Sequence, residues 1–245
     1  MKNNVVVIFF SVAFYIFFVL AVGWLGLLFF PVSYIFNPYL PFALANWDGG
    51  YYLSIAQSGY QNSAQFAFLP LYPLLINIFN FFFDNSLISG LFISWGSLLV
   101  ALIFLFKLVK NEYSEKVGWL SLIYLLLFPT SFYLIAVYTE SLFLMLAVLT
   151  FYFLQRQNKY DLLLATLFTS LALVTRIFGL GLLLALWSAV LTNKQLKYRW
   201  VTVLAPVTLL GYVYYLFLIY QDPLLIVSAQ ANWNREVGWE NINVF

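Results

Sequence analysis

The chain has no cysteine and no histidine among its 245 residues. Without cysteine there is no disulfide, no thiolate metal site and no cysteine nucleophile. Without histidine, a zinc centre is not expected, and a general base has to be a carboxylate or, less often, a tyrosine or lysine. The chain also lacks a phosphate-binding glycine loop and a basic patch with interleaved aromatic residues. We therefore expect neither a nucleotide cofactor nor a nucleic-acid partner.

Charge is scarce as well, because only 8% of the residues are charged while 64% are hydrophobic. Soluble domains carry about 25% charged residues. Apolar runs recur along the whole chain, and many approach the ~20 residues that a helix needs to cross the hydrocarbon core. The first run, residues 5–30, is too long for a signal-peptide core and is predicted to be a retained helix. The composition therefore predicts an all-α polytopic membrane protein.

The few basic residues indicate the orientation in the membrane. Most of them lie in three short clusters between apolar runs, at residues 107–116, 156–159 and 194–199. By the positive-inside rule these clusters and the N-terminus are cytoplasmic. The first loop, residues 31–65, has no lysine or arginine and is then extracytoplasmic. Only two basic residues face the outer side in this scheme, Arg176 and Arg235.

A single domain over residues 1–245 accommodates all of the apolar runs. Residues 66–83 are interrupted by Pro70 and Pro73, so this run is predicted to start as a re-entrant or interfacial segment. Residues 162–191 are too long for one crossing between two cytoplasmic clusters, and two short helices that turn near Arg176 are predicted there. The other predicted crossings are residues 5–30, 87–106, 117–135, 141–154 and 200–220. Residues 221–245 form an outer segment, which we expect to begin a further C-terminal part.

The first loop contains the densest group of polar and aromatic residues. Asp48 is its only charged residue. Asn46 or Asp48 is predicted to cap a short amphipathic helix over residues 49–57, which would lie along the membrane surface. Trp47, Tyr51 and Tyr52 surround the acid with flat apolar faces and polar edges. A helix cap within an interfacial aromatic belt explains the same residues without a site, and both interpretations stay open.

Three further patterns lie on the same predicted side. Residues 66–73 form a proline-containing entry into an apolar run and could provide a wall beside Asp48. Glu140 follows Thr139 in the first turn of a predicted helix, where it stabilises the helix dipole and lies at the depth of Asp48. Arg176 interrupts a long apolar stretch, a placement that costs about 2.5–3.5 kcal/mol if the side chain faces lipid. Such arginines usually face a polar cavity, and the forked guanidinium suits phosphate, although snorkelling to the surface is the simpler alternative.

Taken in order, these patterns resemble the PIG-V-type mannosyltransferases, a family that includes the second mannosyltransferase of GPI-anchor synthesis and many bacterial relatives. The similarity spans about residues 45–235. Its blocks are Trp47-Asp48-Gly49 with Ala67-Phe68-Leu69-Pro70-Leu71-Tyr72-Pro73, Phe128-Pro129-Thr130-Ser131-Phe132 with Tyr138-Thr139-Glu140-Ser141-Leu142-Phe143, Thr175-Arg176 with Gly179, and Ala229-Gln230 with Trp233 and Arg235.

The resemblance implies a GT-C-type transmembrane helix bundle whose extracytoplasmic active site takes a sugar from a polyprenyl-phosphate carrier. Mannose, or another hexose, would pass with inversion to a lipid- or glycan-linked acceptor. The predicted catalytic residues are Asp48, as general base, and Glu140. The predicted donor-phosphate ligands are Arg176 and Arg235. The predicted sugar- or acceptor-binding residues are Trp47, Tyr51, Tyr52, Gln230 and Trp233.

Two other functions fit the same composition. A transporter or lipid flippase would use an intramembrane arginine such as Arg176, but no internal repeat is visible. A non-catalytic subunit of a membrane glycosylation complex would tolerate the loss of Asp48. No cofactor is expected, although Asp48, Glu140 and Asp222 could share a divalent cation. Membrane lipids and a partner subunit are the other expected partners. The absence of cysteine and the tight loops favour a bacterial plasma membrane over the endoplasmic reticulum.

Overall fold

The computed structural model describes residues 2–29, 42–156, 160–192 and 199–233, and all the regular structure in these ranges is helical. The α-helices are α1 (Lys2–Phe29), α2 (Asp48–Ser58), α3 (Leu71–Phe83), α4 (Ser86–Glu112), α5 (Glu115–Leu127), α6 (Glu140–Arg156), α7 (Asp161–Leu173), α8 (Gly179–Thr192), α9 (Val207–Tyr220) and α10 (Leu225–Ser228). The 3-10 turns are η1 (Phe42–Ala45), η2 (Ser63–Ala67), η3 (Ser131–Leu134), η4 (Arg199–Leu204) and η5 (Ala229–Trp233).

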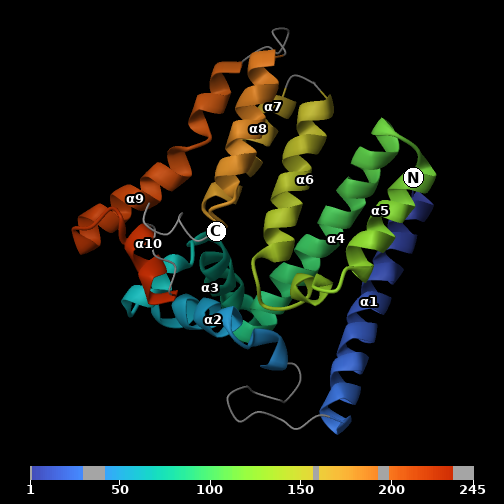
Figure 1. The fold of residues 1–245 in the computed structure, drawn as a ribbon, viewed down its shortest axis with the longest axis horizontal. Coiled ribbons are helices and arrows are strands. Elements are labelled where there is room, and N and C mark those ends of the chain that lie inside the picture. The colour runs from blue at the N-terminus through green and yellow to red at the C-terminus, as the bar shows by residue number, and fades with distance from the viewer. Residues whose placement is uncertain (1, 30–41, 157–159, 193–198, 234–245) are drawn as a thin grey trace, which may run out of the picture.

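The centre of the molecule is a bundle in which α4 packs against α6 and α6 against α7 (Figure 1). One core cluster lies between α2, α3, α4 and α6, where Tyr72 and Ile76 are completely buried. A second cluster joins α1, α4 and α5 around Leu98 and Leu102. Since α2 and α3 share the first core with the bundle helices, the loop that carries Asp48 is held by the bundle itself.

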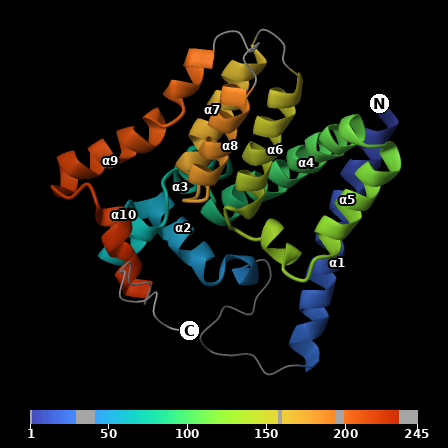
Figure 2. The same ribbon diagram turned by 45° about the horizontal axis from the view of Figure 1, so that its top comes forward.

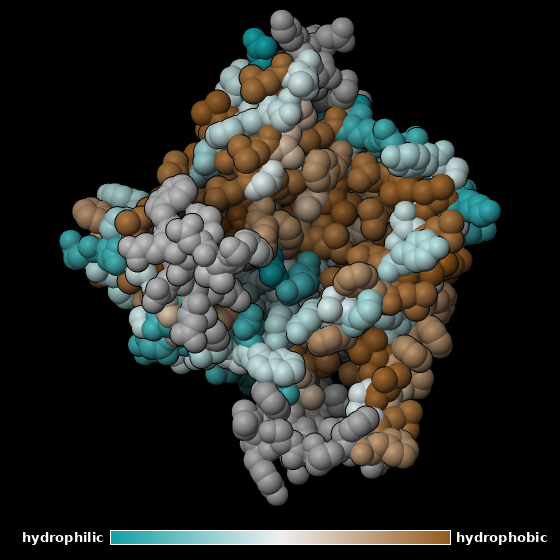
Figure 3. All heavy atoms as spheres, in the orientation of Figure 1, coloured by the Kyte–Doolittle hydropathy of each residue, from teal (hydrophilic) through white to brown (hydrophobic). Residues whose placement is uncertain are grey.

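Within the described residues, three segments are long and apolar enough to cross a membrane, at Asn3–Gly26, Ser86–Glu112 and Arg199–Tyr220. The outward side chains of α1 are large and exposed, Phe10 at 65% and Phe17 at 68%. Exposing such side chains to water would forfeit roughly 1.5–3 kcal/mol each. The face of the bundle in Figure 3 is accordingly hydrophobic over much of its area. The chain is therefore a membrane protein.

The bundle has two chemically different ends. At one end, Asn4 donates to Glu115 with its side-chain nitrogen 3.2 Å from Oε1, and the last turns of α4 and α6 meet through Glu112 and Gln155. This end, which we call the basic end, also carries Lys107 and Lys110 near the end of α4, Lys116 in the first turn of α5 and Arg156 at the end of α6. The other end, the loop end, contains η1, α2, η2, η3, residues 174–178 and α10 (Figures 1 and 2). Lys159, Lys194 and Lys197 lie outside the described residues.

Helix α3 has both of its ends at the loop end. The Leu71 N–H donates to the carbonyl oxygen of Val174 at 3.0 Å, next to the α7–α8 turn. After Phe83 the chain enters α4 within three residues, and Ser86 at the start of α4 accepts a hydrogen bond from Nε2 of Gln57, at the end of α2, at 3.1 Å. The re-entrant or interfacial segment over residues 66–83 stays a prediction.

The predicted crossing over residues 117–135 is wrong in its second half. Helix α5 ends at Leu127, and Phe128 is extended with φ −63° and ψ 135°. Pro129 disfavours the helical conformation of the residue before it and has no N–H for the helix ladder. The remaining residues form η3 and a turn into α6. By contrast, residues 162–191 do form two short helices, α7 and α8, that turn at Arg176.

Candidate active site

The first wall of the site begins with a tight turn at Asn46–Gly49. The Gly49 N–H donates to the Asn46 carbonyl at 3.2 Å, and Trp47 between them has φ 52° and ψ −121°. These angles belong to the first central residue of a type II′ turn, a position that favours glycine. The predicted cap is wrong, because Trp47 occupies the N-cap position without a side-chain cap bond and Asp48 is the first helical residue.

Two long-range hydrogen bonds attach this turn to the segment before α6. The Val137 N–H donates to the Leu44 carbonyl, and the Tyr138 hydroxyl donates to the Asn46 carbonyl, both at 2.9 Å. Gly49 permits the approach, since a Cβ at this residue would lie 3.2 Å from the Val137 carbonyl oxygen. Asp48 is thereby set beside the N-terminus of α6, with Tyr52 one turn further along α2.

The opposite wall comes from the turn between α7 and α8. Helix α8 begins in direct contact with α7, and the absence of a side chain at Gly179 permits this contact. A Cβ at residue 179 would lie 2.7 Å from the backbone of Ala172. This close approach brings Arg176 toward the N-terminus of α6. Its Nη1 lies 2.6 Å from Oε1 of Glu140 and 3.0 Å from Oγ1 of Thr139, and both oxygens accept hydrogen bonds from it.

A chain of polar contacts then runs from α2 to the turn between α7 and α8. The Tyr52 hydroxyl is 3.4 Å from Oγ1 of Thr139, which also contacts Arg176. The Arg176 and Glu140 side chains are 31% and 29% exposed, so the ion pair is partly shielded from solvent. Oε2 of Glu140 is buried and has no hydrogen-bond partner within the described part of the chain. Glu140 therefore acts here as the counter-charge of Arg176.

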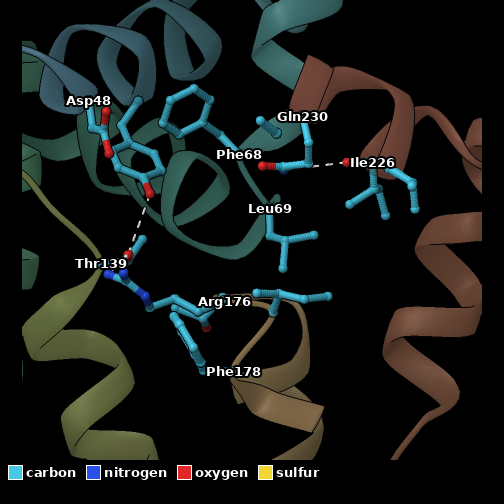
Figure 4. Close-up of a pocket in the computed structure, with 13 residues that line it drawn as sticks. Asp48, Phe68, Leu69, Thr139, Arg176, Phe178, Ile226 and Gln230 are labelled. Atoms are coloured by element: carbon cyan, nitrogen blue, oxygen red, sulfur yellow. Dashed lines mark hydrogen bonds between the residues drawn. The ribbon is translucent and has the colours of Figure 1, made fainter. Parts of the chain in front are cut away.

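These groups surround a cavity of about 500 Å³ (Figure 4). Its walls are formed by Asp48 and Tyr52, residues 67–69, Thr139, residues 175–178, residues 226–227 and Gln230. In Figure 4 Asp48 and Arg176 approach the cavity from different sides, while Gln230 and Ile226 close a third side. The cavity thus combines one carboxylate, one guanidinium and a largely apolar wall.

Aromatic rings form the floor near Asp48. Phe68 stacks on Tyr51 with ring centroids 5.0 Å apart and meets Tyr52 edge-on at 5.1 Å. Burial raises the pKa of the Tyr52 hydroxyl well above its usual range, and burial likewise raises the pKa of Tyr138. Both phenols stay protonated at neutral pH and serve as hydrogen-bond donors or acceptors, not as bases. Among the described side chains that line the cavity, Asp48 is the only carboxylate.

The structure brings together some of the predicted site residues but not all of them. Asp48, Tyr52, Arg176 and Gln230 line the cavity, and Glu140 lies directly behind Arg176. Trp47 is 59% exposed and does not line it. Tyr51 lies behind Phe68. Arg235 and the side chain of Trp233 are outside the described residues.

Several lining residues were not predicted individually. Residues 67–69 belong to the motif that was expected to form a wall beside Asp48. The position of Thr139 directly before Glu140 was noted in the sequence as the start of a helix. Its contacts with both Tyr52 and Arg176 could not be predicted from the sequence. Phe178, Ile226 and Val227 are apolar residues in an apolar sequence, so no local pattern distinguishes them.

A divalent cation shared by Asp48, Glu140 and Asp222 is not supported. Within the described residues no three acidic side chains are grouped closely enough to hold a metal ion. Glu140 is paired with Arg176, and Asp222 accepts a hydrogen bond from the Leu224 N–H at 2.8 Å. The three acids thus have separate local roles.

Comparison with known proteins identifies one family. The model of the family described as Mannosyltransferase (PIG-V) matches residues 27–244. This match covers the cavity and every helix except most of α1. None of the curated proteins and none of the solved structures compared with the chain matches it.

Proposed function

Since this chain belongs to the PIG-V mannosyltransferase family, we propose that it transfers mannose from a polyprenyl-phosphate donor to an acceptor outside the cytoplasm. A glycosyltransferase activity follows from the family; the donor, the side of the membrane and the roles of individual residues are the proposal. The observation that carries it is the convergence of Asp48 and Arg176 on one cavity at the loop end, opposite the basic end of the bundle.

In the proposed reaction, Asp48 is the general base. The acceptor hydroxyl oxygen attacks the anomeric carbon of the mannosyl phosphate, and its proton passes to the Asp48 carboxylate. The bond between the anomeric carbon and the phosphate oxygen breaks, and the electron pair leaves with the polyprenyl phosphate. A β-linked donor gives an α-linked product in this single displacement. General-base assistance of this kind contributes roughly 10²–10⁴-fold.

Arg176 is the proposed ligand of the departing phosphate. Charge grows on the phosphate as the bond breaks, and a fixed guanidinium stabilises that charge in a cavity with apolar walls. The guanidinium has five N–H donors, and only Nη1 is used by Thr139 and Glu140 among the described residues. Nε and Nη2 are therefore left for the phosphate, and Glu140 and Thr139 hold the group in orientation.

The test is sugar transfer from radiolabelled polyprenyl-phosphate mannose in membranes that contain the chain or its Asp48→Asn variant at equal amounts. We expect Asp48→Asn to lower the initial rate by about 10²–10⁴-fold, because the amide accepts no proton. Asp222→Asn is the matched control, since Asp222 is a half-buried acid outside the cavity whose amide counterpart can still accept from the Leu224 N–H. Unchanged transfer by Asp48→Asn would reject Asp48 as the base and favour a non-catalytic subunit.

The transporter alternative has weaker support. An arginine on a substrate path is expected near the middle of the membrane. Arg176 lies instead at the loop end, in the turn after α7, where it is paired with the first residue of α6. Donor movement across vesicle membranes without any new glycosylated product would nevertheless favour it over transfer.

A further inference from the structure

A second polar pocket lies against a different face of α2 from the cavity at Asp48. Its volume is about 410 Å³, and its walls come from the end of α2, the end of α3 and the start of α4. The polar lining residues are Gln57, Asn80, Asp84, Asn85 and Ser86, and Leu53 and Leu87 complete the walls. No residue is shared with the cavity at Asp48.

Side-chain hydrogen bonds hold the three walls together. Gln57 donates from Nε2 to Oγ of Ser86 at 3.1 Å, and the same hydroxyl donates to Oδ1 of Asn80 at 3.3 Å. Nearby, Asn77 donates from Nδ2 to the Ala56 carbonyl at 2.8 Å. The pocket is thus a built feature that links α2, α3 and α4, while Gln57 and Asp84 remain exposed and accessible.

The chemistry of the lining favours a neutral, hydroxyl-rich ligand. Among the described residues no lysine or arginine lines the pocket, which disfavours a phosphate or another anion. Asp84 is the only carboxylate in the described lining, and one carboxylate is too few for a tight divalent-cation site. Three amides, a hydroxyl and a carboxylate offer both donors and acceptors, as the hydroxyl groups of a saccharide require. The two leucines can contact the C–H faces of a sugar ring.

The position of the pocket relates it to the first cavity. Tyr52 and Leu53 are neighbours on α2, yet the former lines the cavity and the latter lines the second pocket. At 1.5 Å per residue, Asp48 and Gln57 are about 13 Å apart along the helix axis. A short oligosaccharide could therefore lie over α2 and reach both.

We propose that this pocket binds the uncharged glycan portion of the acceptor and so selects acceptors that carry more than one sugar. The inference rests on the proposed transferase function for its role in catalysis, whereas saccharide binding itself does not require transfer. The proposed transferase function and the proposed saccharide binding can therefore be disproved independently of each other.

Binding is tested on the full-length protein in lipid nanodiscs with mannotriose, a neutral trisaccharide, by saturation-transfer NMR titration. We expect the intact protein to bind, and Gln57→Ala and Asp84→Asn each to weaken binding about tenfold, the effect of losing one or two hydrogen bonds to the ligand. Asn suits the left-handed backbone of residue 84, where φ is 47°, so Asp84→Asn changes the charge without adding strain.

Gln61→Ala and Asp222→Asn are the matched controls, because Gln61 is exposed, Asp222 is half-buried and neither residue lines either pocket. Mannotriose binding that is absent from the intact protein, or equal in pocket and control variants, would overturn the proposal. If Asp48→Asn retains transfer while Gln57→Ala still loses mannotriose, the proposed base is wrong and the glycan pocket stands.

Discussion

At the residue scale, Trp47 has a backbone conformation that is costly for any residue with a side chain. Its φ of 52° with ψ −121° places it where a type II′ turn normally has glycine. Strain of this kind costs about 1–3 kcal/mol and persists only where the surrounding contacts impose it. Here the contacts are the Val137 and Tyr138 hydrogen bonds, which fix the turn that presents Asp48.

We expect Trp47→Gly to raise the apparent Tm in detergent above that of Trp47→Ala. Both variants lose the indole, but only glycine relieves the strain, by about 1–3 kcal/mol. Differential scanning fluorimetry on the two purified variants measures the difference. Equal melting temperatures would show that the turn is not strained, and Trp47→Ala serves as the control for the lost ring.

Arg176 offers a second prediction at this scale, which tests the proposed phosphate ligand. Lysine keeps the charge but not the forked donors, so Arg176→Lys is expected to lower kcat by about 10²-fold. Steady-state transfer at varied donor concentration measures the effect. Arg156→Lys is the control, because Arg156 also faces an acid, with Nε 3.6 Å from Oδ2 of Asp161, but lies at the basic end. A kcat equal to that of the Arg156 variant would contradict the assigned role.

At the scale of elements, the α7–α8 turn depends on one glycine. A Cβ at Gly179 would lie 2.7 Å from the backbone of Ala172, a distance that forces the two helices apart. Separation of α8 from α7 would move Arg176, which is only three residues earlier. The position of the guanidinium is therefore a property of helix packing as much as of its own side chain.

Gly179→Ala is thus expected to destabilise the protein by about 1–3 kcal/mol and to reduce transfer. Gly181→Ala is the matched control on the same helix, because nothing lies within 4 Å of its added Cβ. That variant should be neutral or stabilising by up to about 1 kcal/mol, as alanine favours the helix. Thermal unfolding and initial transfer rates are measured for both variants. Equal stabilities and equal rates for Gly179→Ala and Gly181→Ala would contradict the proposed close packing of α8 against α7.

At the scale of the whole molecule, the two ends of the bundle are expected to face opposite sides of the membrane. The basic end would be cytoplasmic by the positive-inside rule, and the loop end with its cavity would face outward. The exposed apolar side chains of the flank, such as Phe10 and Phe17, would contact lipid between them. This orientation would give the cavity access to donor and acceptor on the same side.

Because the chain has no cysteine, single cysteines report the orientation directly. We expect Gln61→Cys at the loop end to react with a membrane-impermeant maleimide in intact cells, and Lys116→Cys at the basic end to react only after lysis. Both positions are exposed, so burial does not explain a difference. Labelling of Lys116→Cys alone in intact cells would invert the proposed orientation.

The sequence by itself determined the membrane class and most helix positions. Apolar runs of membrane-spanning length, the breaks at Pro70 and Arg176, and the start of α6 at Glu140 are local properties, readable from neighbouring residues. The early end of α5 also has a local cause, because Pro129 follows it directly. The prediction extended the helix to residue 135 because the residues after Pro129 are largely apolar. The motif around Asp48 and its family were also recognisable from the order of residues alone.

Only the tertiary structure decided how these parts meet. The Arg176–Glu140 pair joins residues 36 apart, and the bond from Tyr138 to Asn46 joins residues 92 apart. Such contacts depend on the angles and depths at which helices pack, and no local pattern encodes them. The strain at Trp47 has the same origin, because the left-handed backbone is imposed by the segment before α6. Asp48 and Arg176 share a cavity because glycine at 49 and 179 lets separate segments approach to contact distance.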